Sequence, residues 1–230
     1  MLKTITKFTL KVIKYSVVIF IISSLFFTIL YRFINPPVTP LMIIRFCEQL
    51  FDKDRKVCFK RNYVSFDTMS KHLPNAAIAS EDNLFMKHSG FDFAEIKKAR
   101  EEAKKGGRKR GASTISQQCA KNVFLYPKHS WIRKGLEVYF TFLIETFWNK
   151  ERIMEVYLNV IEYGDGIYGA EAAAQYYFHK PAKNMSKHEA ALMVACFPNP
   201  LRWNPANPTQ YINKRASQIS YLMDCIGNNF

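Results

Sequence analysis

The chain begins with an uninterrupted apolar run that strongly limits what its N-terminus can form. Residues 15–31 carry no charged side chain, and the first charge after them is Arg32. As a helix these 17 residues are about 25 Å long, slightly short of the ~30 Å hydrocarbon core, and snorkelling of the flanking basic side chains makes up the difference. Four lysines precede the run: Lys3, Lys7, Lys11 and Lys14. The positive-inside rule then keeps residues 1–14 in the cytoplasm, lets residues 15–34 span the membrane, and places the rest outside.

Two other interpretations of this run fit less well. A cleaved signal peptide has a shorter apolar region and small residues at its cleavage site, whereas here YRFINPPVTP follows without an A-x-A-like triplet. A buried core helix is also a poor fit, because four lysines precede a single uninterrupted apolar run. We therefore predict an uncleaved anchor, a juncture over residues 35–70 that begins at Asn35-Pro36-Pro37, and one folded domain over residues 71–230.

Helical patterns fill this domain. One helix opens at Pro74 and ends by presenting residues 81–82, and a second begins at a capping box formed by Asp92 and Glu95. Further helices are expected over residues 131–148, 150–159 and 170–178, in the apolar segment capped by Ser186 and Glu189, and after Asn207-Pro208. Because no convincing alternating strand follows Ser70, the sequence predicts an all-α domain.

Charge and cysteine content narrow the function classes only in part. The formal net charge of +14 indicates an anionic partner, for which nucleic acid and anionic lipid both qualify. The five cysteines form no CxxC pair and no Cys/His cluster at metal-ligand spacing, so no zinc site is predicted. Cys47 and Cys58 would be able to pair in an oxidising compartment, although isolated apolar side chains are the commoner case.

The segment Gly111–Asn122 carries an unusual polar stripe. At helical spacing, one face is formed by Thr114, Gln117, Gln118 and Lys121. Solvated helix faces are usually rich in Glu–Lys pairs, whereas neutral hydrogen-bonding groups beside one cation suit a polar ligand that carries negative charge. The alternative is an ordinary helix that happens to be rich in glutamine.

Carboxylates bracket the stripe in sequence. Glu81 and Asp82 precede it, and Glu137 follows it on a helix that carries Lys134 one turn earlier. We expect these carboxylates to meet over the stripe. The alternative for Glu137 is a surface glutamate paired with Lys134, a contact that stabilises a helix by only a few tenths of a kcal/mol.

Five motifs in this domain resemble, in the same order, those of the biosynthetic peptidoglycan glycosyltransferases of the monofunctional type. They are EDNLFMKHSGFD, GASTISQQCAKNVFL, RKGLE, KERIMEVYLN and YGAEAAAQYYFHKPA, between about residues 75 and 200. The resemblance implies a lysozyme-like helical glycosyltransferase domain on the outer side of the bacterial inner (cytoplasmic) membrane. It implies lipid II, the growing glycan strand and membrane lipids as partners, without nucleic acid or nucleotide sugar, and leaves room for other cell-wall synthesis proteins.

The resemblance also assigns roles to individual residues. Glu81 takes the proton from the acceptor's 4-hydroxyl as that oxygen attacks the donor's anomeric carbon, and inversion gives a β-1,4 bond without a covalent intermediate. Glu137 is expected on the donor side, where it helps to place the leaving diphosphate. The negative charge of the diphosphate is expected to be neutralised by Lys121, Arg133 and Lys134. Neutral hydrogen bonds are expected from Ser113, Thr114, Gln117 and Gln118, and further binding or site-shaping contacts from Asp82, Phe85, His88, Gly90, Asn122, Tyr157 and Asn159.

A basic segment lies between the first carboxylate and the stripe. Its five cations are Lys104, Lys105, Arg108, Lys109 and Arg110. Most such runs are mobile, solvated loops, and we predict a basic lid near the membrane that captures anionic lipid or the growing strand. No cofactor is required, although Mg²⁺ or Mn²⁺ at the diphosphate is compatible with the site.

The sequence departs from the family pattern at two positions. His129 stands where the family often has a basic residue, which makes the charge there depend on pH. Cys119 replaces a larger apolar residue on the buried face of its helix. The S-x-x-K and K-T-G motifs are both absent, so we predict glycan synthesis without transpeptidation.

Two other functions stay open at this point. A lysozyme-like fold with paired carboxylates also suits an enzyme that cleaves the same glycan, but such an enzyme has no lipid diphosphate to hold. A non-enzymatic basic protein that binds the membrane surface would explain the net charge. It would leave the neutral stripe and the bracketing carboxylates unexplained.

Overall fold

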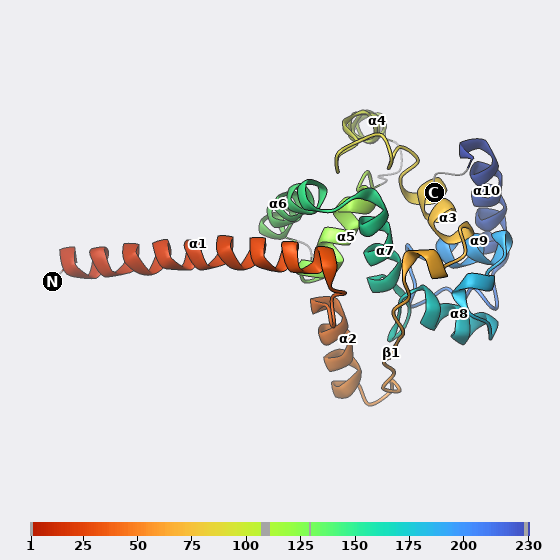
Figure 1. Cartoon of the computed structure of the whole chain (residues 1–230), viewed down its shortest axis with the longest axis horizontal. Helices are drawn as coiled ribbons and strands as arrows, with labels where there is room; N and C mark the ends of the chain where they lie inside the picture. The colour runs from red at the N-terminus through yellow and green to blue at the C-terminus, as the bar shows by residue number, and fades with distance from the viewer. Residues whose placement is uncertain (1, 107–110, 129, 228–229) are drawn as a thin grey trace. The chain divides into compact units, whose positions relative to one another are not determined.

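The computed structural model describes residues 2–106, 111–128, 130–227 and 230, with side chains from residue 7 onward. The chain divides into two compact units, Met1–Asn35 and Pro36–Phe230. The first unit is a single helix, α1 (Leu2–Phe33) (Figure 1). Among the described residues, its segment Lys7–Phe33 is the one stretch long and apolar enough to cross a membrane. The predicted N-terminal apolar helix is confirmed, and it is consistent with membrane anchoring.

The second unit is mostly helical, as the sequence predicts. The α-helices among its described residues are α2 (Pro40–Phe51), α3 (His72–Glu81), α4 (Phe93–Lys104), α5 (Ile115–Phe124), α6 (Trp131–Phe147), α7 (Lys150–Val160), α8 (Ala170–Phe178), α9 (Lys187–Ala195) and α10 (Gln210–Ile226). Two short 3₁₀ helices, η1 (Phe66–Thr68) and η2 (Ala182–Asn184), lie between them. The predicted helices after residue 70 are all present, whereas α2 lies in the predicted juncture of residues 35–70, for which the sequence predicts no helix.

Side-chain caps define where several helices begin. Asp92 accepts a hydrogen bond from the Glu95 backbone N–H at 2.8 Å, and Ser186 and Glu189 form a complete capping box. Such caps satisfy backbone N–H groups that have no partner inside the helix, and each stabilises the protein by about 1 kcal/mol. The start of each of these helices is therefore encoded locally.

Two groups of packed helices form the core and place the site between them. α5 packs against α6 and α7, while α3 packs against α9 and α10, and α3 also contacts α7 (Figure 1). The apolar face of α5 is fully buried at Ile115, Cys119 and Ala120. α4 has no fully buried residue and lies to one side of these groups (Figure 1).

A small sheet corrects the expectation that no strand follows residue 70. β1 (Lys60–Arg61) pairs in parallel with β3 (Ile167–Tyr168), which pairs in antiparallel with β2 (Glu162–Gly164). At Gly166, φ is +71° and a Cβ atom would lie 1.9 Å from the Cys58 carbonyl oxygen, so only glycine fits there. Strands of two or three residues are too short to show the alternation from which strands are predicted.

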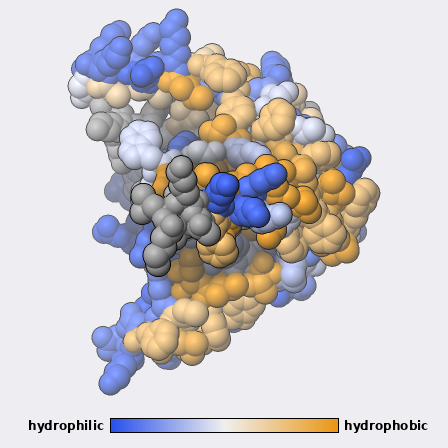
Figure 2. All heavy atoms as spheres, turned by 90° about the vertical axis from the view of Figure 1, so that its left-hand side faces the viewer, coloured by the Kyte–Doolittle hydropathy of each residue, from blue (hydrophilic) through white to orange (hydrophobic). Residues whose placement is uncertain are grey.

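Helices α2 and α6 are among the elements of the second unit that expose large apolar side chains. α2 exposes Ile43, Leu50 and Phe51, and α6 exposes Trp131 and Phe142; Phe51 and Trp131 are 88% and 93% exposed. Figure 2 draws both units, the apolar α1 included, and shows hydrophobic side chains beside hydrophilic ones on the face that it presents. Large exposed apolar areas often mark surfaces that contact a membrane or another protein.

Candidate active site

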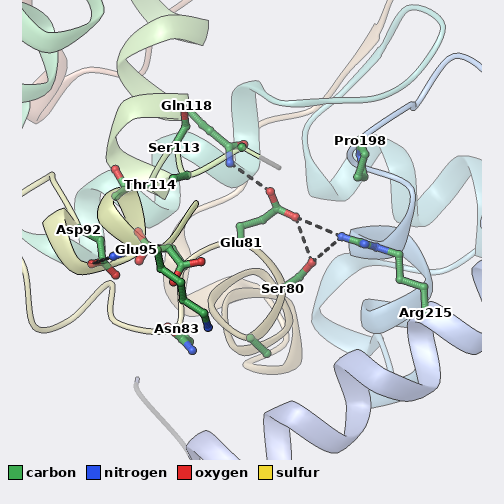
Figure 3. A pocket seen from close by; sticks show the side chains of 15 residues that line it. Ser80, Glu81, Asn83, Asp92, Glu95, Ser113, Thr114, Gln118, Pro198 and Arg215 are labelled. Atoms are coloured by element: carbon green, nitrogen blue, oxygen red, sulfur yellow. Dashed lines mark hydrogen bonds and ion pairs between the residues drawn. The ribbon is translucent and has the colours of Figure 1, made fainter. Parts of the chain in front are cut away.

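Glu81, the last residue of α3, points into a cavity of about 530 Å³ (Figure 3). Its side chain is 17% exposed. One carboxylate oxygen accepts a hydrogen bond from Gln118 Nε2 at 3.1 Å, and the other accepts one from Ser80 Oγ at 3.0 Å. Arg215 Nη2 lies 3.8 Å from the oxygen that Ser80 contacts. The carboxylate is therefore held from two sides while part of it faces the cavity.

Arg215 belongs to the site, although no pattern in the sequence predicts it. Its Nη2 donates a hydrogen bond to Ser80 Oγ at 3.3 Å, and its Nε is buried without a partner among the described residues. The packing of α10 against α3 brings it to Glu81. A single arginine on an amphipathic helix carries no local signal that links it to a carboxylate so distant in sequence.

Asp82 joins the loop after α3 to the start of α5. Its Oδ2 accepts a hydrogen bond from the Ile115 backbone N–H at 3.0 Å, and its Oδ1 lies 2.8 Å from His88 Nε2. The Gly90 N–H donates to His88 Nδ1 at 3.2 Å, so the proton of this imidazole is on Nε2 when the ring is neutral. The Gly90 carbonyl accepts a hydrogen bond from Thr114 Oγ1 at 2.7 Å. These hydrogen bonds form a closed ring that fixes the loop of residues 82–90 beside Glu81.

The polar stripe on α5 is shorter than the sequence predicts. Thr114 and Gln117 are 2% and 4% exposed and form a reciprocal capping box at the start of the helix. Their side chains are therefore engaged in capping the helix, although Thr114 also lines the cavity beside Glu81. Gln118 lines this cavity too, and Lys121 lines the next one. The Tyr157 hydroxyl donates to Gln118 Oε1 at 3.1 Å and so orients the amide with its Nε2 toward the carboxylate of α3.

A second cavity of about 270 Å³ adjoins the first, because Ser113 and Gln118 line both. Its other lining residues are Lys121, Arg133, Lys134 and Glu137. Glu137 is 3% exposed, with Arg133 Nη1 at 2.7 Å from one carboxylate oxygen and Lys134 Nζ at 2.5 Å from the other. The interpretation of Glu137 as a surface glutamate is therefore wrong.

Lys121 is the cation in this cavity that Glu137 does not hold. Its ammonium has no hydrogen bond or ion pair with the residues that the structure describes. Burial lowers the pKa of Lys121, and Arg133 and Lys134 lower it further, while Glu137 acts in the opposite direction. A bound anion would supply the missing counter-charge. With three cations and one carboxylate, the cavity suits an anion of more than one charge, such as a diphosphate.

The remaining predicted residues line neither of these two cavities or lie outside the described part of the chain. Phe85 is fully buried, and Asn122 is 6% exposed and lines a third cavity of about 210 Å³ together with Lys121. Lys104 and Lys105 are exposed at the end of α4. Arg108, Lys109, Arg110 and His129 lie outside the described residues.

The described residues offer no group of three or more His, Cys, Asp or Glu side chains that would hold a metal ion by themselves. All five cysteines are unpaired, so Cys47 and Cys58 form no disulfide. Cys119 is buried, as predicted, and burial raises the pKa of its thiol.

Comparison with known proteins gives consistent matches. Residues 50–224 match the family model described as Transglycosylase. A biosynthetic peptidoglycan transglycosylase of Bacteroides thetaiotaomicron is 56% identical over 219 residues, which cover 94% of this chain and 88% of that protein. A protein of the same name from Bdellovibrio bacteriovorus is 48% identical over 89% of this chain and 81% of its own length. One from Pseudomonas fluorescens is 42% identical over 100% of this chain and 93% of its own length.

Proposed function

The chain belongs to the transglycosylase family and is a glycosyltransferase that polymerises peptidoglycan glycan, and we propose that Glu81 and Glu137 carry its reaction. Its domain is lysozyme-like, and its substrates are lipid II and the growing glycan strand. The observation that best supports the proposed roles is the pair of adjoining cavities. One holds a partly exposed carboxylate, and the other holds three cations around a buried one.

Glu81 acts as the general base in the first cavity. It takes the proton of the acceptor's 4-hydroxyl as that oxygen attacks the donor's anomeric carbon. The bond from this carbon to the diphosphate breaks, and its electron pair leaves with undecaprenyl diphosphate. Inversion of the α-linked donor yields the β-1,4 bond. The hydrogen bonds from Gln118 and Ser80 hold the carboxylate in place for this transfer.

The cations of the second cavity take the donor's diphosphate. Glu137 orients Arg133 and Lys134 through two short ion pairs, and Lys121 supplies an ammonium that is not already paired with a described carboxylate. Arginine is suited to a bidentate grip on phosphate oxygens, and lysine acts as a point charge. A glycan-cleaving enzyme has no use for such a cluster, which favours synthesis over cleavage.

Incubation of the full-length, detergent-solubilised chain with labelled lipid II tests this function. We expect glycan polymer without peptide cross-links, because the chain lacks the transpeptidase motifs. The matched negative control is the same preparation carrying Glu81→Gln. Cleavage of preformed glycan with no polymer from lipid II would instead support the hydrolase interpretation.

We expect α1 to be an uncleaved anchor in the inner membrane, with residues 1–14 in the cytoplasm and residues 35–230 on the outer side. A reporter that is active only outside the cytoplasm should therefore be active when fused after Phe230, and inactive when fused at the N-terminus. The exposed apolar side chains of α2 and α6 give membrane lipids a further surface to contact. Recovery of a soluble protein that lacks residues 1–34 would contradict this topology.

The cations of residues 104–110 should strengthen capture of the anionic substrate by long-range attraction. Exposed charges act over a Debye length of about 8 Å at physiological salt. Neutralising all five should raise the KM for lipid II, and more at low salt than at high salt. Neutralising five exposed lysines outside this segment controls for overall charge, because it removes the same number of charges: Lys53, Lys56, Lys71, Lys183 and Lys214. An unchanged salt dependence in the five-residue variant would exclude the role.

A further inference from the structure

Glu145, on α6, is a nearly buried carboxylate that the proposed reaction does not use. Its side chain is 9% exposed. Lys150 Nζ, at the start of α7, donates to its Oε1 at 2.8 Å, and the Ser116 hydroxyl on α5 donates to the same oxygen. Ser116 is fully buried. One carboxylate oxygen therefore ties together the three helices that pack beside the site.

Lys150 extends this cluster to the loop that follows Glu81. Its ammonium lies over the Phe85 ring, 4.5 Å from the centroid. Phe85 is fully buried, and its backbone N–H donates to the Asp82 carbonyl at 3.1 Å. The Lys150 side chain is 20% exposed, and a cation over an aromatic face is attracted by the negative charge density of the ring. Lys150 therefore connects the carboxylate of Glu145 to the loop of residues 82–90.

Glu145 also packs directly against the other end of the same loop. At Gly90, where φ is +87°, a Cβ atom would lie 2.9 Å from Glu145 Cγ and 2.8 Å from Thr141 Cγ2. The Gly90 carbonyl in turn accepts the hydrogen bond of Thr114, which caps α5. The loop therefore rests on Glu145 where it meets the helix that carries Gln118.

We propose that Glu145 is a positioning residue for the polymerisation reaction. Through Ser116 and Lys150 it fixes the first turn of α5 and residues 82–90, and so sets where Gln118 meets Glu81. The desolvation of a buried ion pair largely offsets its attraction, so such a pair contributes little net stability compared with apolar packing. The cluster is better explained by a positional role, in which it fixes α5, α6, α7 and the loop of residues 82–90 relative to one another. The inference rests on the proposed role of Glu81.

Glu145→Gln tests the role of the charge, because the amide keeps an acceptor oxygen for Ser116 but loses the ion pair with Lys150. We expect kcat to fall by about 10- to 100-fold, since a misplacement of 1 Å distant from the chemistry can have such an effect. Binding of undecaprenyl diphosphate should stay within about twofold of wild type, because Glu145 does not line the second cavity. Lys150→Arg, which keeps the charge, should retain most of the activity.

Ser116→Ala is the second variant, and it tests the positioning role of Glu145 if Glu145→Gln does not fold. It should lower kcat with normal diphosphate binding, and its effect should be less than additive with that of Glu145→Gln. Glu151→Gln, the same substitution at an exposed position beside Lys150, is the control and should behave as wild type.

Three results would overturn the inference. They are an unchanged kcat in folded Glu145→Gln, an unchanged kcat in Ser116→Ala, or a loss of diphosphate binding equal to the loss of kcat, which would indicate a general structural defect. Glu81→Gln is measured in the same assay. An active Glu81→Gln variant would refute the proposed base itself, whereas an inactive one beside a normal Glu145→Gln would refute only the positioning role.

Discussion

The Glu81→Gln variant is expected to fold normally and to polymerise lipid II about 10²- to 10⁴-fold more slowly than the wild type. Glutamine has nearly the same shape, so its side chain can keep contacts with Gln118 and Ser80. An amide, however, does not accept the proton of the attacking hydroxyl. The measurement is the rate of polymer formation from labelled lipid II, at matched folding by circular dichroism.

Glu151→Gln is the matched control for this experiment, because it makes the same chemical change at an exposed position on α7. It should polymerise at the wild-type rate. If folded Glu81→Gln retained activity within a factor of a few of the wild type, Glu81 would not be the base, and another group in the first cavity would have to take the proton.

Local sequence signals predicted the helices well. The Ser186–Glu189 capping box and the Asp92 cap each lie within four residues of sequence, so their geometry depends little on the rest of the fold. The small sheet depends on distant pairing instead, because Lys60 aligns with Ile167 only after the domain has folded. Two-residue strands leave no pattern from which that pairing can be read.

The candidate site was predictable where motifs carry it and not where packing alone does. The motifs named Glu81, Gln118 and Lys121, and these residues line the two adjoining cavities. The stripe pattern does not predict the capping role of Gln117, because it places the start of the helix before Ile115. Arg215 reaches Glu81 only through the contact of α10 with α3, which no local pattern encodes.

The environment of Glu137 predicts an effect that differs from that of Glu81. Its carboxylate is buried between Arg133 and Lys134, so it is better placed to orient these cations than to accept a proton from the substrate. Glu137→Gln should therefore impair polymerisation severely but less completely than Glu81→Gln. It should also weaken the binding of undecaprenyl diphosphate, because the two cations lose the group that fixes them.

Stability must be measured alongside this effect, because Arg133 is only 6% exposed and would keep its charge without a carboxylate partner. Removing one member of a buried pair can destabilise a protein by about 3–5 kcal/mol, so activity and binding should be compared well below the melting temperature of the variant. Glu101→Gln, at an exposed position on α4, is the control. If folded Glu137→Gln bound the diphosphate and polymerised lipid II normally, the pairs with Arg133 and Lys134 would serve only the packing of α6, and Lys121 would be left as the main cation on the donor side.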